Sequence, residues 1–272
     1  DSAALISAVE RGGIAPPASL SRGDRDGWLD LLLTERVRPH LGQKRPTILY
    51  DYPATQAALA RVRPDEPPVA EQRPIAAIVL AAGRSTRMGG SNKLLAEIGG
   101  KPLVRIAVEE ALASRARPVI VVTGHERERV EAALAGLPVR LVHNTDFAQG
   151  LGTSLRTGIA AVPAEVDGAI VCLGDMPQVD AALIDRLIAA FDPAKGALAV
   201  VPTIEGRRGN PVLWSRRFFQ DLMAIEGDVG ARHLIGRYGE AVVELPVTGK
   251  GALVDVDTPE ALRGVKAEIE GT

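Results

Sequence analysis

Apolar runs and amphipathic stretches alternate along the chain from about residue 75 to the C-terminus. Residues 75–81 form a continuous apolar run, which is typical of a strand buried on both faces of a sheet. Residues 103–114 carry apolar side chains at helical spacing, which indicates a helix with one buried side. The same reasoning predicts strands at residues 118–122, 139–142, 168–173 and 198–201, and helices at residues 127–134, 155–161, 181–191 and 229–238. Asp180 and Thr258 are the expected N-caps of the helix at 181–191 and of a last helix that begins at Pro259.

This alternation of strands and helices predicts the fold class. Strand–helix–strand units place neighbouring strands parallel to each other and connect them by right-handed crossovers. We therefore expect residues 75–272 to form an α/β domain with a mostly parallel sheet that is covered by helices.

The first 74 residues follow a different pattern. Residues 63–74 read RPDEPPVAEQRP and contain four prolines and five charged residues, as a linker would. Before them, the sequence predicts a helix capped by Asp26, with Trp28 and the following leucines on one apolar face, and a short strand at residues 47–50. This stretch is too short and too polar to bury a good core alone. We expect residues 1–74 to be an N-terminal extension.

The composition narrows the function classes. Apolar residues make up 46% of the chain and charged residues 24%, as in an ordinary globular protein. The formal net charge of −2 disfavours non-specific binding of nucleic acid. The single cysteine, Cys172, lies in an apolar run, so we interpret it as a core residue and expect a reducing compartment. With no apolar stretch of ~20 residues and no signal-peptide pattern, we expect a cytoplasmic protein that does not bind membranes.

The strongest candidate for chemistry is the segment LAAGRSTRMGGSNK, from Leu80 to Lys93. Its glycines let backbone N–H groups approach a polyphosphate, and its interleaved cations, Arg84, Arg87 and Lys93, add charge-assisted contacts. The segment leaves the carboxyl end of a predicted strand, where ligands bind in open α/β sheets. It fits neither GxGxxG nor GxxxxGK[ST], which excludes the dinucleotide-oxidoreductase and P-loop interpretations. A turn with solvated arginines is the alternative.

This segment resembles the signature of the molybdenum cofactor cytidylyltransferases and their guanylyltransferase relatives. Five further motifs resemble that family in the same order: QGLGTSLRTG (149–158), LGDMP (173–177), RGNP (208–211), GDVGAR (227–232) and DVDTP (255–259). The resemblance implies a Rossmann-like nucleotidyltransferase fold, which is a three-layer sandwich with a short N-terminal extension in this chain.

The resemblance also implies roles for individual residues. Lys93, Arg87 and Asp175 are the expected catalytic residues. The expected nucleotide-binding residues are Leu80, Ala81, Ala82, Gly83, Arg84, Ser85, Arg87, Lys93, His125 and Ser154. For His125 a plain surface position is the alternative.

Asp175 and Asp257 are the expected metal ligands. Asp175 lies just past a predicted buried strand, and a carboxylate there suits Mg²⁺, with Mn²⁺ as a substitute. A helix cap or a turn residue is the alternative for Asp175. For Asp257 the alternative is that it or Asp255 caps the last helix.

The acceptor is expected to contact Arg208, Asn210, Pro211 and Asp228. The alternatives are an exposed hairpin for the RGNP motif and a helix N-cap for Asp228.

The implied reaction is Mg²⁺-dependent transfer of CMP from CTP to molybdenum-molybdopterin. Pyrophosphate leaves, and molybdopterin cytosine dinucleotide forms for delivery to a molybdoenzyme or its chaperone. CTP is favoured because Ala82 stands where the guanylyl branch usually has glycine. A guanylyltransferase, another small-acceptor nucleotidylyltransferase and a non-catalytic nucleotide-binding protein are the alternatives.

Residues 25–71 have a resemblance of their own. They are similar to an internal piece of the elongation factor P lysyltransferases, which are relatives of class II lysyl-tRNA synthetases. The flanking motifs that carry ATP-binding arginines in that family are absent here. We interpret this segment as a truncated remnant without catalytic power.

Overall fold

The computed structural model of the chain describes residues 2–17, 20–32, 35, 52–53, 61–63, 69–71, 74–88, 91–225, 227 and 231–270. Contacts between residues divide the chain into two compact units, Asp1–Gln72 and Arg73–Thr272. Each unit is described by itself.

The first unit contains two helices that contact each other, α1 (Ser2–Arg11) and α2 (Arg25–Leu32). Val9 and Trp28 are buried, and the Trp28 indole N–H donates a hydrogen bond to the Ser21 carbonyl at 2.8 Å. The prediction that Asp26 caps the helix is wrong. The helix begins at Arg25, and the Asp24 carboxylate accepts a hydrogen bond from the Gly27 backbone N–H at 2.9 Å, so Asp24 provides the cap.

The same unit contains a small antiparallel sheet. Its strands are β1 (Tyr52–Pro53), β2 (Arg61–Arg63) and β3 (Val69–Glu71), with β3 in the middle. The strand predicted at residues 47–50 lies outside the described residues.

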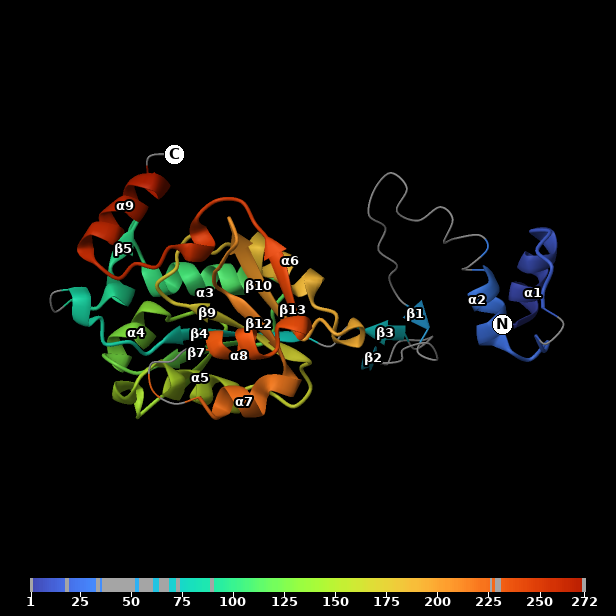
Figure 1. The fold of residues 1–272 in the computed structure, drawn as a ribbon, viewed down its shortest axis with the longest axis horizontal. Helices are drawn as coiled ribbons and strands as arrows, with labels where there is room; N and C mark the ends of the chain where they lie inside the picture. The colour runs from blue at the N-terminus through green and yellow to red at the C-terminus, as the bar shows by residue number, and fades with distance from the viewer. Residues whose placement is uncertain are drawn as a thin grey trace. The chain divides into compact units, whose positions relative to one another are not determined.

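The second unit is built on one central sheet (Figure 1). The strands run in the order β11-β10-β12-β9-β4-β7-β8, and β13 also pairs with β10. Their bounds are β4 (Ile75–Ala81), β7 (Val119–Thr123), β8 (Arg140–His143), β9 (Gly168–Leu173), β10 (Ala199–Ile204), β11 (Arg207–Arg208), β12 (Val212–Ser215) and β13 (Val242–Pro246). The pairings of β4 with β7 and β9, of β7 with β8 and of β10 with β13 are parallel, which confirms the predicted mostly parallel sheet.

The strands β12 and β13 were not predicted. β12 is antiparallel to both of its neighbours, β9 and β10, so it adds no strand–helix–strand unit. It is four residues long and buried throughout, and such a short apolar run carries no periodicity that separates a strand from a helix.

Helices cover both faces of the sheet, which makes the three-layer sandwich (Figure 1). One core contains α3 (Leu103–Ala113), α4 (Arg127–Ala133) and α6 (Ala181–Ala190). The other contains α5 (Leu151–Ala160), α7 (Phe219–Met223) and α8 (Arg232–Arg237). Alternate residues of β4 serve the two cores, because successive side chains of a strand point to opposite faces.

A third, smaller cluster anchors the C-terminal helix α9 (Pro259–Glu270). Val265 of α9 and the preceding Val256 are buried with Leu103 and Ile98, and Ile98 belongs to the hairpin of β5 (Glu97–Ile98) and β6 (Lys101–Pro102). The chain that leads into α9 is therefore fixed against the domain.

The predicted caps of the two helices are confirmed. The Asp180 carboxylate accepts a hydrogen bond from the Leu183 N–H at 2.8 Å, and the Thr258 hydroxyl accepts one from the Ala261 N–H at 3.2 Å. Helix α5 begins at Leu151, four residues before the predicted start, since Gly152, Thr153 and Ser154 gave no apolar signal.

Cys172 lies in β9 and is buried, as predicted. Burial raises the pKa of its thiol to about 12. None of the helices in the described parts of the chain is long and apolar enough to cross a membrane.

The antiparallel strand β12 generates a stability prediction. Leu213 is fully buried between Ile170 of β9 and Val200 of β10, so Leu213→Ala should lower the free energy of unfolding by about 2–5 kcal/mol. Leu141, which is 40% exposed, is the control, and Leu141→Ala should change stability by less than about 0.5 kcal/mol. Urea denaturation followed by circular dichroism measures both. Equal effects of the two substitutions would contradict the placement of β12 in the core.

Candidate functional site

The site lies where the parallel strands end. Leu80 near the end of β4 is in register with Leu173, the last residue of β9. The loop after β9 closes on β4, because the Gly174 N–H donates to the Leu80 carbonyl at 3.0 Å. The loop after β7 does the same, since the His125 N–H donates to the Ala82 carbonyl at 3.2 Å. Three loops thus start together at one edge of the sheet.

Lys93 is held by hydrogen bonds within the first loop. It begins a single 3₁₀ turn, Lys93–Leu95, and the Asn92 side chain caps this turn by accepting from the Leu94 N–H at 3.1 Å. The Ser85 hydroxyl accepts from the Lys93 N–H at 3.0 Å. Ser85 itself adopts a left-handed conformation, with φ of 53°, which turns the loop back toward Lys93. The backbone of Lys93 is therefore fixed relative to β4.

The Lys93 ammonium bridges two carboxylates from distant parts of the chain. It donates to Asp175, which follows β9, and to Asp257, which precedes α9, the second at 2.5 Å. The Arg87 guanidinium contacts the other oxygen of Asp257 at 2.6 Å. The two carboxylate segments are also joined directly, because the Val256 N–H donates to the Asp175 carbonyl at 2.9 Å.

Asp255 completes an acidic cluster with Asp175 and Asp257. One carboxylate oxygen from each of the three residues lies within 4.8 Å of the others. From the sequence, Asp255 is expected only as an alternative cap. Thr258 caps α9 instead, which leaves both aspartates of the DVDTP motif available to the cluster. The signal for Asp255 was its spacing of two from Asp257, which places both side chains on one side of an extended segment.

The charges of the cluster depend on one another. Burial lowers the pKa of Lys93, but its contacts with Asp175 and Asp257 outweigh burial and raise this pKa above the ordinary value. Burial raises the pKa of Asp257, but Lys93 and then Arg87 outweigh it and hold this pKa below the ordinary value. Burial and the neighbouring Asp257 charge raise the pKa of Asp255. Two cationic side chains thus already serve as counter-ions in this cluster.

A cavity of about 470 Å³, here called the first cavity, adjoins the cluster. The three aspartates line it. So do seven of the expected nucleotide-binding residues, which are Leu80, Ala82, Gly83, Arg84, Arg87, Lys93 and Ser154. Phe147, which is not among the expected site residues, also lines it.

Three other expected nucleotide-binding residues lie elsewhere among the described residues. Ala81 is buried in the core on the opposite face of the sheet. Ser85 serves the loop by accepting the Lys93 hydrogen bond. The half-buried ring of His125 lies 6.0 Å from the ring of Phe147.

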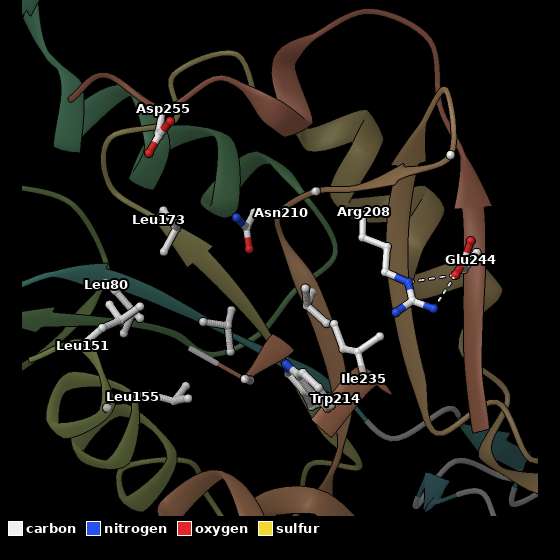
Figure 2. Close-up of a pocket in the computed structure, with 16 residues that line it drawn as sticks. Leu80, Leu151, Leu155, Leu173, Arg208, Asn210, Trp214, Ile235, Glu244 and Asp255 are labelled. Carbon is white, nitrogen blue, oxygen red and sulfur yellow. Dashed lines mark hydrogen bonds and ion pairs between the residues drawn. The ribbon is translucent and has the colours of Figure 1, made fainter. Parts of the chain in front are cut away.

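A second cavity of about 740 Å³ adjoins the first, and Figure 2 shows the residues that line it. Both cavities are lined by Leu80, Leu151, Leu173 and Asp255. Figure 2 shows Asp255 and Leu173 at one end and an ion pair of Arg208 with Glu244 at the other. The Arg208 nitrogens lie 2.8 and 2.7 Å from the same Glu244 oxygen.

Two of the four expected acceptor residues line the second cavity. Arg208 and Asn210 line the second cavity, whereas Pro211 is not among the described residues that line it. Asp228 lies outside the described residues. The turn before Asn210 needs a glycine, because a Cβ on Gly209 would lie 2.2 Å from the Ala252 carbonyl oxygen.

Most residues of the second cavity are not predictable from the sequence. Val212 and Trp214 come from β12, Ile235 from α8 and Glu244 from β13. The strands β12 and β13 were not predicted, and helix α8 was predicted with longer bounds than it has. The sequence therefore provided no reason to place these side chains around one cavity.

The parallel sheet, with a cation-rich loop and three carboxylates at one edge, defines a nucleotidyltransferase fold. Residues 77–242 match the MobA-like NTP transferase domain. Because this match covers more than half of the chain, the chain belongs to that family. The match confirms the predicted nucleotidyltransferase domain. It does not extend to residues 25–71, whose resemblance to lysyltransferases stays a prediction.

The chain is also similar in sequence to curated relatives. The chain is 31% identical over 187 residues to the bifunctional protein GlmU of Leifsonia xyli subsp. xyli, which covers 66% of this chain and 38% of that protein. The chain spans only 27% of the length of one such curated relative and 38% of another.

Solved structures agree as well. Rv0371c from Mycobacterium tuberculosis H37Rv matches with a TM-score of 0.61 and 30% identity over 71% of this chain and 98% of that one. A structure of Rv0371c in complex with manganese matches with a TM-score of 0.61 and 29% identity over 71% of this chain and 97% of that one.

The capped turn at Lys93 generates a prediction. Asn92→Ala removes the side chain that accepts the Leu94 N–H, so the free energy of unfolding should fall by about 1 kcal/mol. Ser91→Ala changes an exposed neighbour and should cost less than about 0.5 kcal/mol. Urea denaturation of both variants measures the difference. A neutral Asn92→Ala would mean that the cap does not stabilise the turn.

Proposed function

We propose that this protein transfers CMP from CTP to molybdenum-molybdopterin, with a divalent metal, and releases pyrophosphate. The observation that carries the proposal is the position of the acidic cluster. Asp255 lines both cavities, and Asp175 and Asp257 line the first. Two ligands in adjoining cavities would therefore meet beside three carboxylates, as a donor and an acceptor must in a direct transfer.

The first cavity suits the nucleotide. Arg84, Arg87 and Lys93 give it three cationic side chains, which can offset the charge of a triphosphate. Catalysis of an in-line displacement at the α-phosphorus depends mainly on positioning and charge stabilisation. Lys93, which is held by Ser85 and Asn92, would place its ammonium against the phosphate where charge builds.

The acidic cluster suits a hard divalent cation. Its donors are three carboxylates within 4.8 Å, and oxygen donors are what Mg²⁺ and Mn²⁺ take. Asp175, Asp255 and Asp257 would hold the ion. The bound ion would supply charge neutralisation at the phosphates. Rv0371c, whose structure is similar to this chain, has been solved in complex with manganese, and this supports a divalent metal here. We propose Mg²⁺ as the ion for this chain.

The second cavity suits a partly apolar acceptor with polar edges. Its wall contains the apolar side chains of Val212, Trp214 and Ile235, whereas Arg208 and Glu244 are polar. A ring system with hydrogen-bonding edges, such as that of molybdopterin, fits this division. The product would pass to a molybdoenzyme or its chaperone.

The choice of base rests on Ala82. Its side chain lines the first cavity, where a glycine would leave more room. A smaller pyrimidine base therefore fits better than a purine. GTP as the donor is the alternative.

The metal assignment predicts the effect of Asp175→Asn. Loss of one carboxylate from the cluster should lower kcat/KM by about 100-fold or more, because charge stabilisation at the phosphates depends on it. Glu260→Gln, on the exposed side of α9, is a control that should keep full activity. Pyrophosphate release with CTP, Mg²⁺ and molybdenum-molybdopterin measures both. Near-normal turnover of Asp175→Asn would exclude this residue as a ligand.

The base assignment predicts a preference for CTP of roughly tenfold in kcat/KM over GTP, since one methyl group gives a pocket only modest selectivity. Ala82→Gly should shift the preference partly toward GTP. Ala81→Gly is a matched control, because Ala81 lies in the core on the other face of the sheet and should leave the preference unchanged. Equal use of CTP and GTP by the unmodified protein would contradict the cytidylyl assignment.

A further inference from the structure

Lys93 occupies the position between the two carboxylates that would hold a metal ion. Its ammonium contacts one oxygen of Asp175 and one oxygen of Asp257. The exposed fractions of the three side chains are 14%, 13% and 20%, so water covers little of this group. The protein thus supplies its own cation to the cluster.

A divalent ion and the ammonium compete for these two oxygens. Mg²⁺ binds carboxylate oxygens at about 2.0–2.1 Å. A metal ion on the same two oxygens would lie within a few ångströms of Nζ, where two cations repel each other strongly. Binding of the metal through these two oxygens is therefore favoured when the ammonium moves away.

The first cavity gives the ammonium another place. Lys93 lines this cavity, beside Arg84 and Arg87. The backbone of Lys93 is fixed by Ser85 and Asn92, but its four-carbon stem is flexible. A phosphate group in the cavity would attract the ammonium without any movement of the loop.

We propose that Lys93 is an internal cation that closes the metal site until the phosphates of a nucleotide draw it away. The metal and the nucleotide then bind with positive coupling, and each raises the affinity for the other by the same factor. This inference rests on the proposed function, because it assumes that the acidic cluster binds the metal.

Arg87 provides an internal comparison. It carries the same charge as Lys93 and also contacts Asp257, at 2.6 Å. However, its side chain is 70% exposed, and its guanidinium pairs with the Asp257 oxygen that Lys93 does not contact. Loss of Arg87 therefore removes one positive charge near the cluster and leaves Lys93 between the two carboxylates.

The experiment measures binding of Mn²⁺ alone, without nucleotide, by electron paramagnetic resonance of the free ion. Lys93→Met should tighten Mn²⁺ binding by at least about tenfold, because a cation in direct contact with the ligand oxygens is removed. Arg87→Met should tighten it much less. Lys101→Met is a remote control, since Lys101 pairs with Glu109 in an exposed position, and it should have no effect.

Two outcomes would overturn the proposal. If the unmodified protein and Lys93→Met bind Mn²⁺ equally, Lys93 does not close the site. If Arg87→Met tightens binding as much as Lys93→Met does, net charge alone explains the gain. Lys93→Gln, together with the rise in melting temperature on adding Mg²⁺, repeats the test if Lys93→Met folds poorly.

A double variant separates this inference from the proposed function. Asp175→Asn in the Lys93→Met background should lose the gain in Mn²⁺ affinity. If the gain remains, the ion binds elsewhere and the metal assignment of the proposed function fails. If the gain is lost, the acidic cluster is the metal site, and the comparison of Lys93→Met with Arg87→Met decides the role of Lys93.

Discussion

The parallel pairing of β4 with β7 and β9 is the constraint on which the rest of the second unit depends. It places the ends of three strands at one edge of the sheet, so that segments far apart in the sequence begin their loops side by side. The loop with Lys93 and the loop with Asp175 meet there. Because β4 is buried on both faces, its register also fixes both cores. The site is thus a direct consequence of how one apolar strand pairs.

The parallel part of this arrangement could be predicted because its signals are local. The apolar runs of β4 and β9 were predicted with the bounds that the structure shows. The caps at Asp180 and Thr258 were recognisable from side chains that accept hydrogen bonds at helix starts. Asp26 was mistaken for a cap because two aspartates lie close together, and only the helix start decides between them.

The second cavity could not be predicted, for a physical reason. Its walls come from β12, α8 and β13, which pack through long-range pairing and not through a local periodic pattern. The partnership of Arg208 with Glu244 arises because β11 and β13 both pair with β10, on strands 36 residues apart in sequence. The same limit applies to Asp255, whose spacing from Asp257 was visible but whose distance to Asp175 was not.

The close packing of the segment before α9 has a practical consequence. The family match ends at residue 242, the first residue of β13, yet Asp255 and Asp257 lie beyond it. Glycines let this segment lie directly against its neighbours, since a Cβ on Gly251 would lie 2.6 Å from the Gln178 carbonyl oxygen. An expression boundary drawn at the end of the match would retain most of the sheet and discard two of the three clustered carboxylates. A fragment for crystallography should therefore extend through α9.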